Sequence, residues 1–201
     1  SAGLAVASLL IATYAGFISG VDRDWTTPVF AISAAVLLLA NSRIRQSWLA
    51  YAGSGFVFIC LIHGLILNEV LKKTLESWTI MPDQPFLMAC LLHATFCCVT
   101  ALEIWRRPKP VSGTTEGELS LWSGFSCPLS ISALISTTLA IPLILYTHPY
   151  QFAAHAAYGF WVSVIWLAVA FLWESRWGFA AAQALASVAL GFLVTAICRN
   201  T

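Results

Sequence analysis

Long apolar runs are the feature that most limits what this chain can fold into. Seven runs of about 17–25 residues contain few or no charged side chains, and this is the length of helix that crosses the hydrocarbon core of a bilayer. The runs cover 2–20, 26–42, 47–68, 85–105, 127–147, 151–173 and 177–198. They predict an all-α, polytopic transmembrane helical bundle of about seven spans, with 1–201 forming a single membrane domain.

Composition supports a bilayer as the solvent of this chain. Of its 201 residues 59% are hydrophobic and 9% are charged, whereas an average soluble domain is about 25% charged. So few charged side chains cannot cover a water-exposed surface, but lipid tails solvate an apolar one. The formal net charge of +1 and the lack of a basic patch give no electrostatic case for binding nucleic acid. The expected partners are the lipid bilayer and other membrane subunits.

Basic residues in the connections between the runs give the expected sidedness. If residue 1 lies on side A of the membrane, six basic residues lie on side A and four on side B. The side-A set is Arg43, Arg45, Arg106, Arg107, Lys109 and Arg176, and the side-B set is Arg23, Lys72, Lys73 and Arg199. By the positive-inside rule side A is cytoplasmic. We therefore expect a multi-pass protein of the plasma or inner cell membrane with its N-terminus in the cytoplasm.

The chain begins with Ser1, and its first apolar run follows at once. No charged segment precedes Ala2, so the first run does not have the form of a secretory signal peptide. We interpret the chain as a fragment of a longer or processed protein, in which flanking domains could carry part of the activity.

Two connections are longer than a tight turn. In residues 69–84, the side chains of Leu71, Leu75 and Trp78 fall on one helical face, which predicts a short helix lying in the membrane interface. A helical extension of the third run is the alternative. Residues 107–126 contain several Pro and Gly residues and predict a flexible linker, with four helices before it and three after it.

Local signals predict one helix start and several close helix contacts. Thr26-Thr27-Pro28 predicts the start of the second helix, with the proline in its first turn. Small residues spaced four apart let helix backbones approach closely, and such ridges should pack on neighbouring helices. These small residues are Gly16 and Gly20 in the first run, and Gly178, Ala182 and Ala186 in the last.

Few ionisable groups lie inside the runs. Glu103 and Glu174 lie near the side-A ends of their helices, beside Arg106 and Arg176, where interfacial ion pairing explains them. No Asp, Lys or Arg occurs in the middle of a run, which argues against an ion-coupled carrier that uses a buried carboxylate. The seventh run has no lysine, which excludes a retinal protein of the usual kind.

All four histidines fall in the side-B half of the bilayer or at its edge. His63 and His93 lie inside the third and fourth runs, His148 ends the fifth, and His155 opens the sixth. A histidine inside a membrane is costly unless it has a partner, so each one is a candidate for chemistry.

His63 and His93 each follow a cysteine at the same spacing, in Cys60-Leu61-Ile62-His63 and Cys90-Leu91-Leu92-His93. Positions i and i+3 share a helix face, so each helix offers a thiol and an imidazole together. If the two faces meet, Cys60, His63, Cys90 and His93 form a Cys2His2 set suited to zinc or copper. Alternatively, His63 and His93 alone could bind a haem or a chlorophyll-type pigment, and none of these cofactors is favoured over the others.

A plainer interpretation of these residues is favoured. The histidines would hydrogen-bond across helices, and the cysteines would fill space as small apolar side chains. Cys-x-x-His is not a specific pattern in a chain with six cysteines. Five of the six lie inside apolar runs, which also argues against a disulfide framework.

Catalytic motifs are nearly absent. Gly53-Ser54-Gly55 resembles part of the serine nucleophile motif of the rhomboid family, but this sequence lacks the leading glycine and has no evident partner histidine on a later helix. No HExxH, phosphate-binding glycine loop or dinucleotide fingerprint occurs. A thin side-B set could handle a lipid-linked sugar or phosphate, although interfacial anchoring explains it equally well. This set is Arg23, Lys72, Lys73, His148 and Tyr150.

Three functions remain open, and the sequence leaves undecided whether the chain is an enzyme. The first is a multi-pass membrane domain of a larger protein or complex, with a scaffold, assembly or passive-pathway role. The second is a membrane enzyme of lipid or glycan processing at the outer leaflet, with the side-B histidines as acid and base. The third is a haem, pigment or metal-binding redox protein that uses His63 and His93. The scarcity of buried charge and the small-residue ridges favour the first.

Overall fold

The computed structural model describes residues 23–77, 84–106, 122–146 and 151–200. Within these ranges the chain is almost entirely helical and forms no strand, which confirms the all-α prediction. The long helices are α2 (Arg23–Ile44), α3 (Ser47–Ile62), α5 (Pro85–Arg106), α7 (Cys127–Tyr146), α8 (Phe152–Leu172) and α9 (Arg176–Asn200). Shorter elements are α4 (Glu69–Ser77) and two π-helical turns, η1 (His63–Leu67) and η2 (Trp122–Ser126).

Six helices of the described ranges are long and apolar enough to cross a membrane. They are Thr26–Ile44, Ser47–Leu67, Pro85–Arg106, Trp122–Tyr146, Phe152–Leu172 and Arg176–Arg199. Each corresponds to one of the apolar runs predicted from the sequence. The first predicted run, 2–20, lies outside the described residues, so a seventh span stays a prediction.

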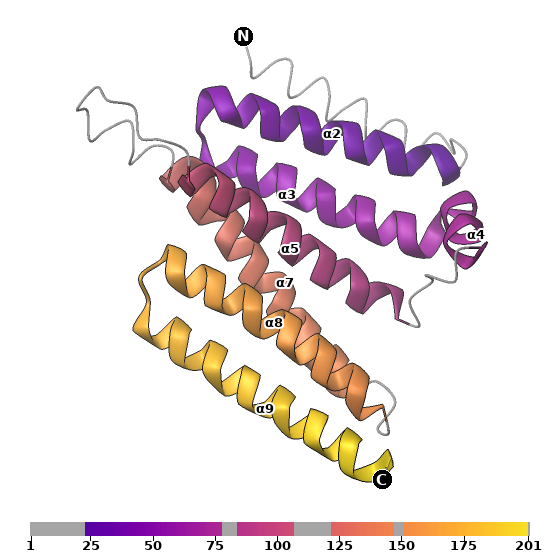
Figure 1. Ribbon diagram of the computed structural model, residues 1–201. Helices are drawn as coiled ribbons and strands as arrows, with labels where there is room; N and C mark the ends of the chain where they lie inside the picture. The colour runs from indigo at the N-terminus through magenta and orange to yellow at the C-terminus, as the bar shows by residue number, and fades with distance from the viewer. Residues whose placement is uncertain (1–22, 78–83, 107–121, 147–150, 201) are drawn as a thin grey trace.

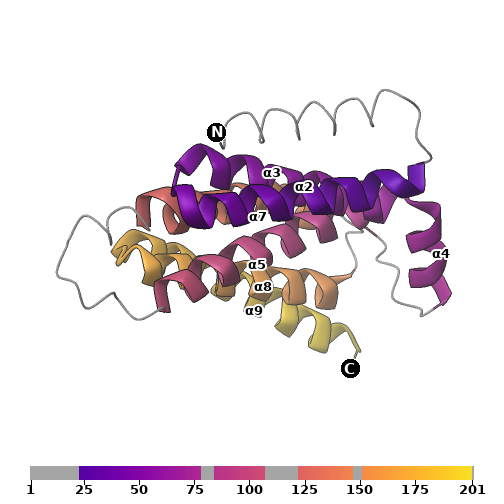
Figure 2. The same ribbon diagram turned by 90° about the horizontal axis from the view of Figure 1, so that it is seen from above.

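The long helices form two layers. In Figure 1, α2, α3, α5, α8 and α9 follow one another across the molecule, and α7 crosses behind α5 and α8. The main apolar core lies where α5, α7 and α8 meet, around Ala94, Leu129 and Ile165. Viewed from above in Figure 2, α9 lies at the edge of the bundle, and of the helices that the structure describes only α8 contacts it substantially.

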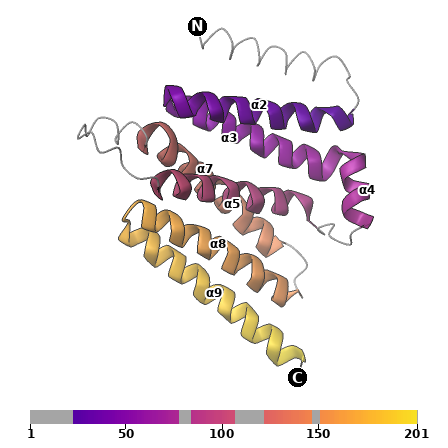
Figure 3. The same ribbon diagram turned by 45° about the horizontal axis from the view of Figure 1, so that its top comes forward.

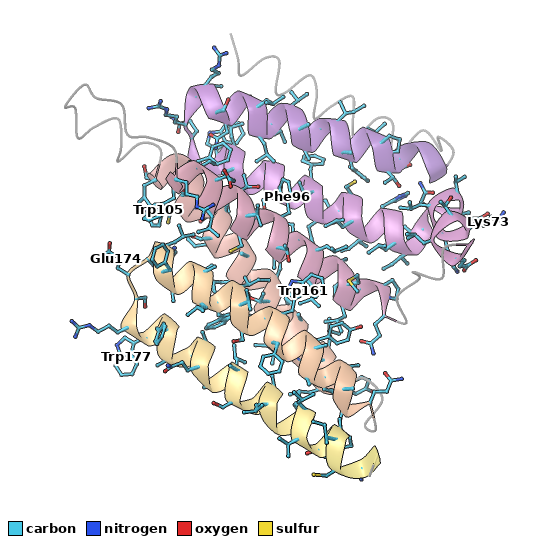
Figure 4. The ribbon with its side chains drawn as sticks, viewed as in Figure 1. Lys73, Phe96, Trp105, Trp161, Glu174 and Trp177 are labelled. Carbon is cyan, nitrogen blue, oxygen red and sulfur yellow. The ribbon has the colours of Figure 1, made fainter. Side chains whose placement is uncertain are left out.

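The two ends of the bundle differ in character. One end holds the α2–α3 turn, the C-terminus of α5 and the α8–α9 turn, and it carries Arg43, Arg45, Arg106 and Arg176; we call it the arginine end. Figure 4 shows Trp105, Glu174 and Trp177 at this end and Lys73 at the opposite end, on α4. Four of the six basic residues that the sequence assigned to side A are therefore grouped at one end, and the other two, Arg107 and Lys109, lie outside the described residues.

The connection after α3 breaks the helix. Asn68 has an extended backbone (φ −82°, ψ 107°), and its Oδ1 accepts a hydrogen bond of 2.8 Å from the Leu71 N–H at the start of α4. Figure 3 shows that α4 then turns away from the direction of α3. The hypothesis that residues 69–84 extend the third span is therefore wrong, and a separate short helix fits the interfacial alternative. Trp78 lies outside the described residues.

Two helix starts differ from the sequence prediction. α2 begins at Arg23, so Pro28 lies in its second turn and Thr26 does not cap the helix. The fourth described span begins at Trp122 because η2 adds a buried turn before α7. The end of the predicted linker 107–126 is thus helical, and its remainder lies outside the described residues. Because α7 packs closely on α5, the helices do not separate into a front and a back group.

Tight packing explains why η2 is buried. A Cβ atom on Gly124 would lie 2.7 Å from the carbonyl carbon of Arg45, so only glycine allows this approach. Asn41, which is fully buried, donates from Nδ2 to the Gly124 carbonyl at 2.8 Å and accepts from the Gln46 N–H at 2.7 Å. One side chain therefore joins the α2–α3 turn to η2.

The small residues of α9 pack on α8, as predicted for Gly178 and Ala182. A Cβ on Gly178 would lie 3.0 Å from Cβ of Ala170. Ala182 is buried, and its carbonyl accepts a hydrogen bond of 3.0 Å from the Ser163 hydroxyl. Gly16 and Gly20 lie outside the described residues.

Candidate functional site

The most polar contact inside the bundle surrounds His93. Its Nδ1 lies 2.7 Å from the Ser136 hydroxyl of α7, and its Nε2 lies 3.0 Å from both the hydroxyl and the carbonyl oxygen of Ser54 on α3. The Cys97 sulfur lies 3.4 Å from Nε2 and from the Ser54 hydroxyl. We call Ser54, His93, Cys97 and Ser136 the polar clamp, because they join α3, α5 and α7.

Proton positions in the polar clamp follow from its acceptors. A carbonyl oxygen only accepts, so the bond to Ser54 O assigns a proton to Nε2 of His93. In the neutral ring Nδ1 is then the acceptor, and the Ser136 hydroxyl donates to it. Both ring nitrogens of His93 are therefore used in holding helices together.

The polar clamp also has the outline of a Ser–His nucleophile pair, with Ser136 in the place of the group that orients the histidine. Two features oppose that chemistry. Nε2 carries the proton that a general base must lack. In addition, Ser54, His93 and Ser136 are only 2%, 4% and 3% exposed, so a substrate carbonyl cannot approach the hydroxyl. The arrangement is better suited to structure than to catalysis.

His63 belongs to a second, separate polar contact. Its Nδ1 lies 2.9 Å from the Thr27 hydroxyl of α2, and the Asn68 amide donates to the same hydroxyl at 3.0 Å. The Cys60 thiol donates weakly to the Thr27 carbonyl at 3.5 Å. Phe30 packs edge-on against the imidazole. This contact fixes α2 on the end of α3, where the chain turns into α4.

The remaining histidines lie elsewhere. Nδ1 of His155 donates to the Gln151 carbonyl at 2.7 Å, and its ring packs against Phe152 and Phe192 between α8 and α9. His148 lies outside the described residues. The side-B histidines that the structure describes therefore do not form one acid–base site.

The convergence expected of the two Cys-x-x-His pairs does not occur. Cys90 is fully buried in an apolar cluster with Leu87 and Val162, whereas Cys60 and His63 face α2. Across the ranges that the structure describes, no group of three or more His, Cys, Asp or Glu side chains could hold a metal ion. The predicted set of Cys60, His63, Cys90 and His93 is divided among different helix contacts because the two histidines point to different neighbours. A tetrapyrrole ligated by His93 would have to displace Ser54 or Ser136 from its ring.

Two tryptophans of α8 and the tryptophan that caps its C-terminus supply further cross-links that the sequence did not indicate. The indole N–H groups of Trp161, Trp166 and Trp173 donate to the hydroxyls of Thr95, Thr137 and Ser130 at 2.7–3.0 Å. Trp161 is labelled in Figure 4, between α5 and α8. Every buried side-chain nitrogen or oxygen in the described part of the chain has a hydrogen-bond partner. The buried polar groups that the structure describes therefore form hydrogen bonds within the bundle, many of them between helices.

Two surface features remain, and both involve α9. A groove of about 1040 Å³ runs between α5, α8 and the start of α9, with Glu103, Arg106, Glu174 and Arg176 at the arginine end. Elsewhere α9 is the least buried of the six described spans: only 11% of the residues in its most apolar stretch are buried inside the protein. Glu103 and Arg106 form a loose, exposed ion pair of 4.0 Å, as predicted. Glu174 and Arg176, for which the sequence also predicted pairing, form no ion pair in the part of the chain that the structure describes.

Comparison with protein-family models, with curated proteins and with solved structures finds no match to this chain. The described part of the chain has the geometry of a membrane-embedded helical protein, with six apolar helices long enough to cross a bilayer.

Proposed function

We propose that the chain is a non-catalytic membrane assembly domain that dimerises with a second copy of itself through the outward face of α9. The observation that carries this proposal is a row of small and polar residues on that face. Gln183, Ser187, Gly191 and Thr195 recur every four residues, so they form one stripe along the helix, and all four are exposed. We call these four residues the outward stripe.

The outward stripe is distinct from the contact that α9 makes with α8. Ala182 and Ala189 are 2% and 1% exposed against α8. About two and a half helical turns separate Ala182 from Gly191, which puts the two residues on opposite sides of α9. A Cβ on Gly191 would meet no atom within 4 Å. The stripe therefore faces away from the bundle.

Small residues on a lipid-facing surface favour a second helix over lipid. Membrane helices associate where Gly, Ser and Thr let the backbones approach closely, and the motif Ser187-x-x-x-Gly191-x-x-x-Thr195 repeats that pattern twice. Ser187 lies near the middle of the span Arg176–Arg199, so Gln183 and Gly191 both lie at the depth of hydrocarbon. An amide at this depth is costly unless it finds a hydrogen-bond partner.

A second copy of the chain suits this stripe better than an unrelated helix. Two copies in one membrane have the same orientation, so a two-fold dimer brings each residue near its own equivalent. The Gln183 amide has both donors and an acceptor and can pair with itself across the axis. Its side chain has no hydrogen-bond partner within the described ranges, and the partner copy would supply one.

Disulfide cross-linking of reconstituted protein tests this arrangement. In a Cys198→Ser background, which removes the exposed native thiol, Thr195→Cys should form a dimer on oxidation in lipid vesicles. Ile197→Cys is the matched control, because Ile197 is 57% exposed but lies to the side of the stripe. Equal cross-linking at the two positions would contradict the proposal.

A packing variant tests the same surface without cysteine. Gly191→Leu should weaken dimerisation about tenfold, since the added side chain separates the helices at their closest point. Leu190→Phe adds bulk beside the stripe and should leave the dimer intact. Fluorescence energy transfer between labelled copies in vesicles measures both, and an unchanged dimer in Gly191→Leu would refute the proposal.

The sidedness of the chain is part of the same proposal. The four arginines grouped at the arginine end support a cytoplasmic position for that end in a plasma or inner cell membrane. The enzyme and redox hypotheses have less support, because His63, His93 and His155 each hydrogen-bond to separate parts of the bundle.

A further inference from the structure

The groove between α5, α8 and the start of α9 faces the bilayer. Its volume of about 1040 Å³ is the size of a small-molecule site. Its walls are apolar, and several of the lining side chains are exposed: Val99 by 52%, Leu167 by 43% and Phe171 by 61%. In a membrane these side chains meet lipid, so the groove opens sideways into hydrocarbon.

The length of the groove matches one leaflet. On α8 its lining runs from Val164 to the turn at Glu174, which is about 15 Å of helix, whereas the hydrocarbon core is about 30 Å thick. A transmembrane helix would need a groove across both leaflets. A single acyl chain needs only the half that is present, so the occupant is a lipid.

The arginine end of the groove lies at the level of lipid headgroups. Trp105 and Trp177 are 48% and 87% exposed at this end, and Figure 4 shows them beside Glu174. Exposed tryptophans gather at the boundary between hydrocarbon and headgroups. The charged residues among them are therefore within reach of a phosphate and of the group attached to it.

The groove lining at this end carries two positive and two negative side chains. Arg106 and Arg176 can bind a phosphate, helped by the N-terminus of α9, where the Ser175 hydroxyl accepts the Gly178 N–H at 3.1 Å. Glu103 and Glu174 oppose a purely anionic headgroup but suit an ammonium. The Glu103–Arg106 contact is 4.0 Å long and exposed, so it is weak and can rearrange around a ligand.

The turn between α8 and α9 holds Glu174 in a conformation that favours glycine. Its φ is +49°, with its N–H donating to the Phe171 carbonyl at 3.3 Å and the Ser175 N–H donating to the Ala170 carbonyl at 3.0 Å. This is the Schellman ending of a helix, whose left-handed position is usually glycine. Binding a cation at the mouth of the groove would explain why a glutamate occupies this position in place of glycine.

We propose that this groove binds one zwitterionic phospholipid with a primary-amine headgroup, of phosphatidylethanolamine chemistry. One acyl chain lies along Val99, Val164 and Leu167. The phosphate is bound by Arg106 and Arg176, and the ammonium donates hydrogen bonds to Glu103 and Glu174. The groove reaches along α9 only as far as Phe179, about 18 Å before Gly191, where the proposed dimer approaches most closely, so this site does not depend on dimerisation.

Native mass spectrometry of the purified chain with phosphatidylethanolamine, phosphatidylcholine and phosphatidylglycerol of equal acyl length tests the proposal. The wild type should retain the ethanolamine lipid about tenfold better than the other two, because only that headgroup supplies both a phosphate and N–H donors. Glu103→Gln with Glu174→Gln should remove this preference. Arg106→Gln with Arg176→Gln should weaken retention of all three lipids.

Matched controls separate the site from general effects. Arg43→Gln removes a basic residue at the same end of the bundle but outside the groove and should leave lipid retention unchanged. Ala168→Trp fills the groove between its walls and should reduce retention of every lipid. Circular dichroism and gel filtration of each variant check folding, which should persist because the substituted charges are exposed.

Each other outcome overturns the proposal. Equal retention of the three lipids would mean that the groove holds ordinary annular lipid. A preference for phosphatidylglycerol would mean that only the arginines act. If Arg106→Gln with Arg176→Gln left lipid retention unchanged, these arginines would not bind the headgroup. A disulfide between two copies of Leu167→Cys would identify a protein as the occupant of the groove.

Discussion

Replacing His93 by leucine should lower the unfolding free energy of the bundle without adding or removing a charged group. Nδ1 of the imidazole accepts a hydrogen bond of 2.7 Å from the Ser136 hydroxyl, and its Nε2 donates one of 3.0 Å to the Ser54 carbonyl. In membrane proteins such bonds contribute about 0.6 kcal/mol on average and about 1.7 kcal/mol at most. Leucine restores most of the apolar volume at a cost below about 1.5 kcal/mol. The two bonds together contribute about 1–3 kcal/mol and repacking adds up to about 1.5 kcal/mol, so the expected loss in unfolding free energy is about 1–5 kcal/mol.

The two serines of the polar clamp should couple differently to His93. Ser136→Ala removes the hydroxyl that donates to Nδ1, so a double-mutant cycle with His93→Leu should give a coupling of about 0.6–1.7 kcal/mol. Ser54→Ala keeps the carbonyl that accepts from Nε2 and removes only the nearby hydroxyl. Its coupling to His93 should fall below about 0.5 kcal/mol, the error of additivity for independent sites.

Reversible unfolding in mixed micelles, followed by circular dichroism, measures these cycles. If the coupling of Ser54 equals or exceeds that of Ser136, the Ser54 hydroxyl donates to Nε2 and the proton assignment is wrong. That result would support the alternative in which Ser54 is a nucleophile and His93 its general base. Labelling of Ser54 by a fluorophosphonate probe, absent in Ser54→Ala, would lead to the same conclusion.

Four further perturbations have distinct expected outcomes. Asn41→Leu should lower the unfolding free energy by about 2 kcal/mol in the same assay, because it leaves the Gly124 carbonyl without this donor. Asn41→Asp should cost at least as much, because it buries a carboxylate against the same carbonyl oxygen. Gly124→Ala should cost about 1–3 kcal/mol through collision with Arg45, whereas Gly55→Ala, with open space around it, should cost nothing measurable. Glu174→Gly should stabilise the α8–α9 turn by about 1 kcal/mol and weaken retention of the amine lipid; unchanged stability would argue against strain at this turn. An alkaline phosphatase fused after Thr201 should be active outside the cell, and an inactive fusion with a fluorescent cytoplasmic equivalent would reverse the assigned sidedness.

The spans were predictable because the signal for a membrane helix is local. Apolar length alone placed α3 and α5 within a residue or two of their observed starts at Ser47 and Pro85. The grouping of arginines at one end followed from the alternation of spans. The sequence predicted the end of the third run at residue 68 but left open whether the helix breaks there or continues, because an extended residue stabilised by its own side chain differs little in sequence from a continuing helix.

Contacts between helices were not predictable, because they depend on how the helices are offset. Counting from the arginine end, Ser54 lies about 10 Å along α3 and His93 about 20 Å along α5, yet the two side chains meet. The same holds for Asn41 and Gly124, which belong to segments that appeared to be a helix end and a linker. Composition indicates which polar residues need partners, but the offset between helices decides which partners they find.

The outward stripe and the lipid groove meet α9 at different heights, so their functions can be separated: Phe179 is one four-residue step before Gln183, whereas Gly191, where the two copies approach most closely, is about 18 Å further along the helix. Phe179 lines the groove, and the twelve-residue step from Phe179 to Gly191 rotates by about 120° around the helix. A second helix on the stripe would therefore flank the groove without filling it. Gly191→Leu should weaken the dimer about tenfold and leave lipid retention unchanged. Glu103→Gln with Glu174→Gln should remove the preference for the ethanolamine lipid and leave the dimer unchanged. If either variant disturbed both properties, dimerisation and lipid binding would have to share one surface of α9.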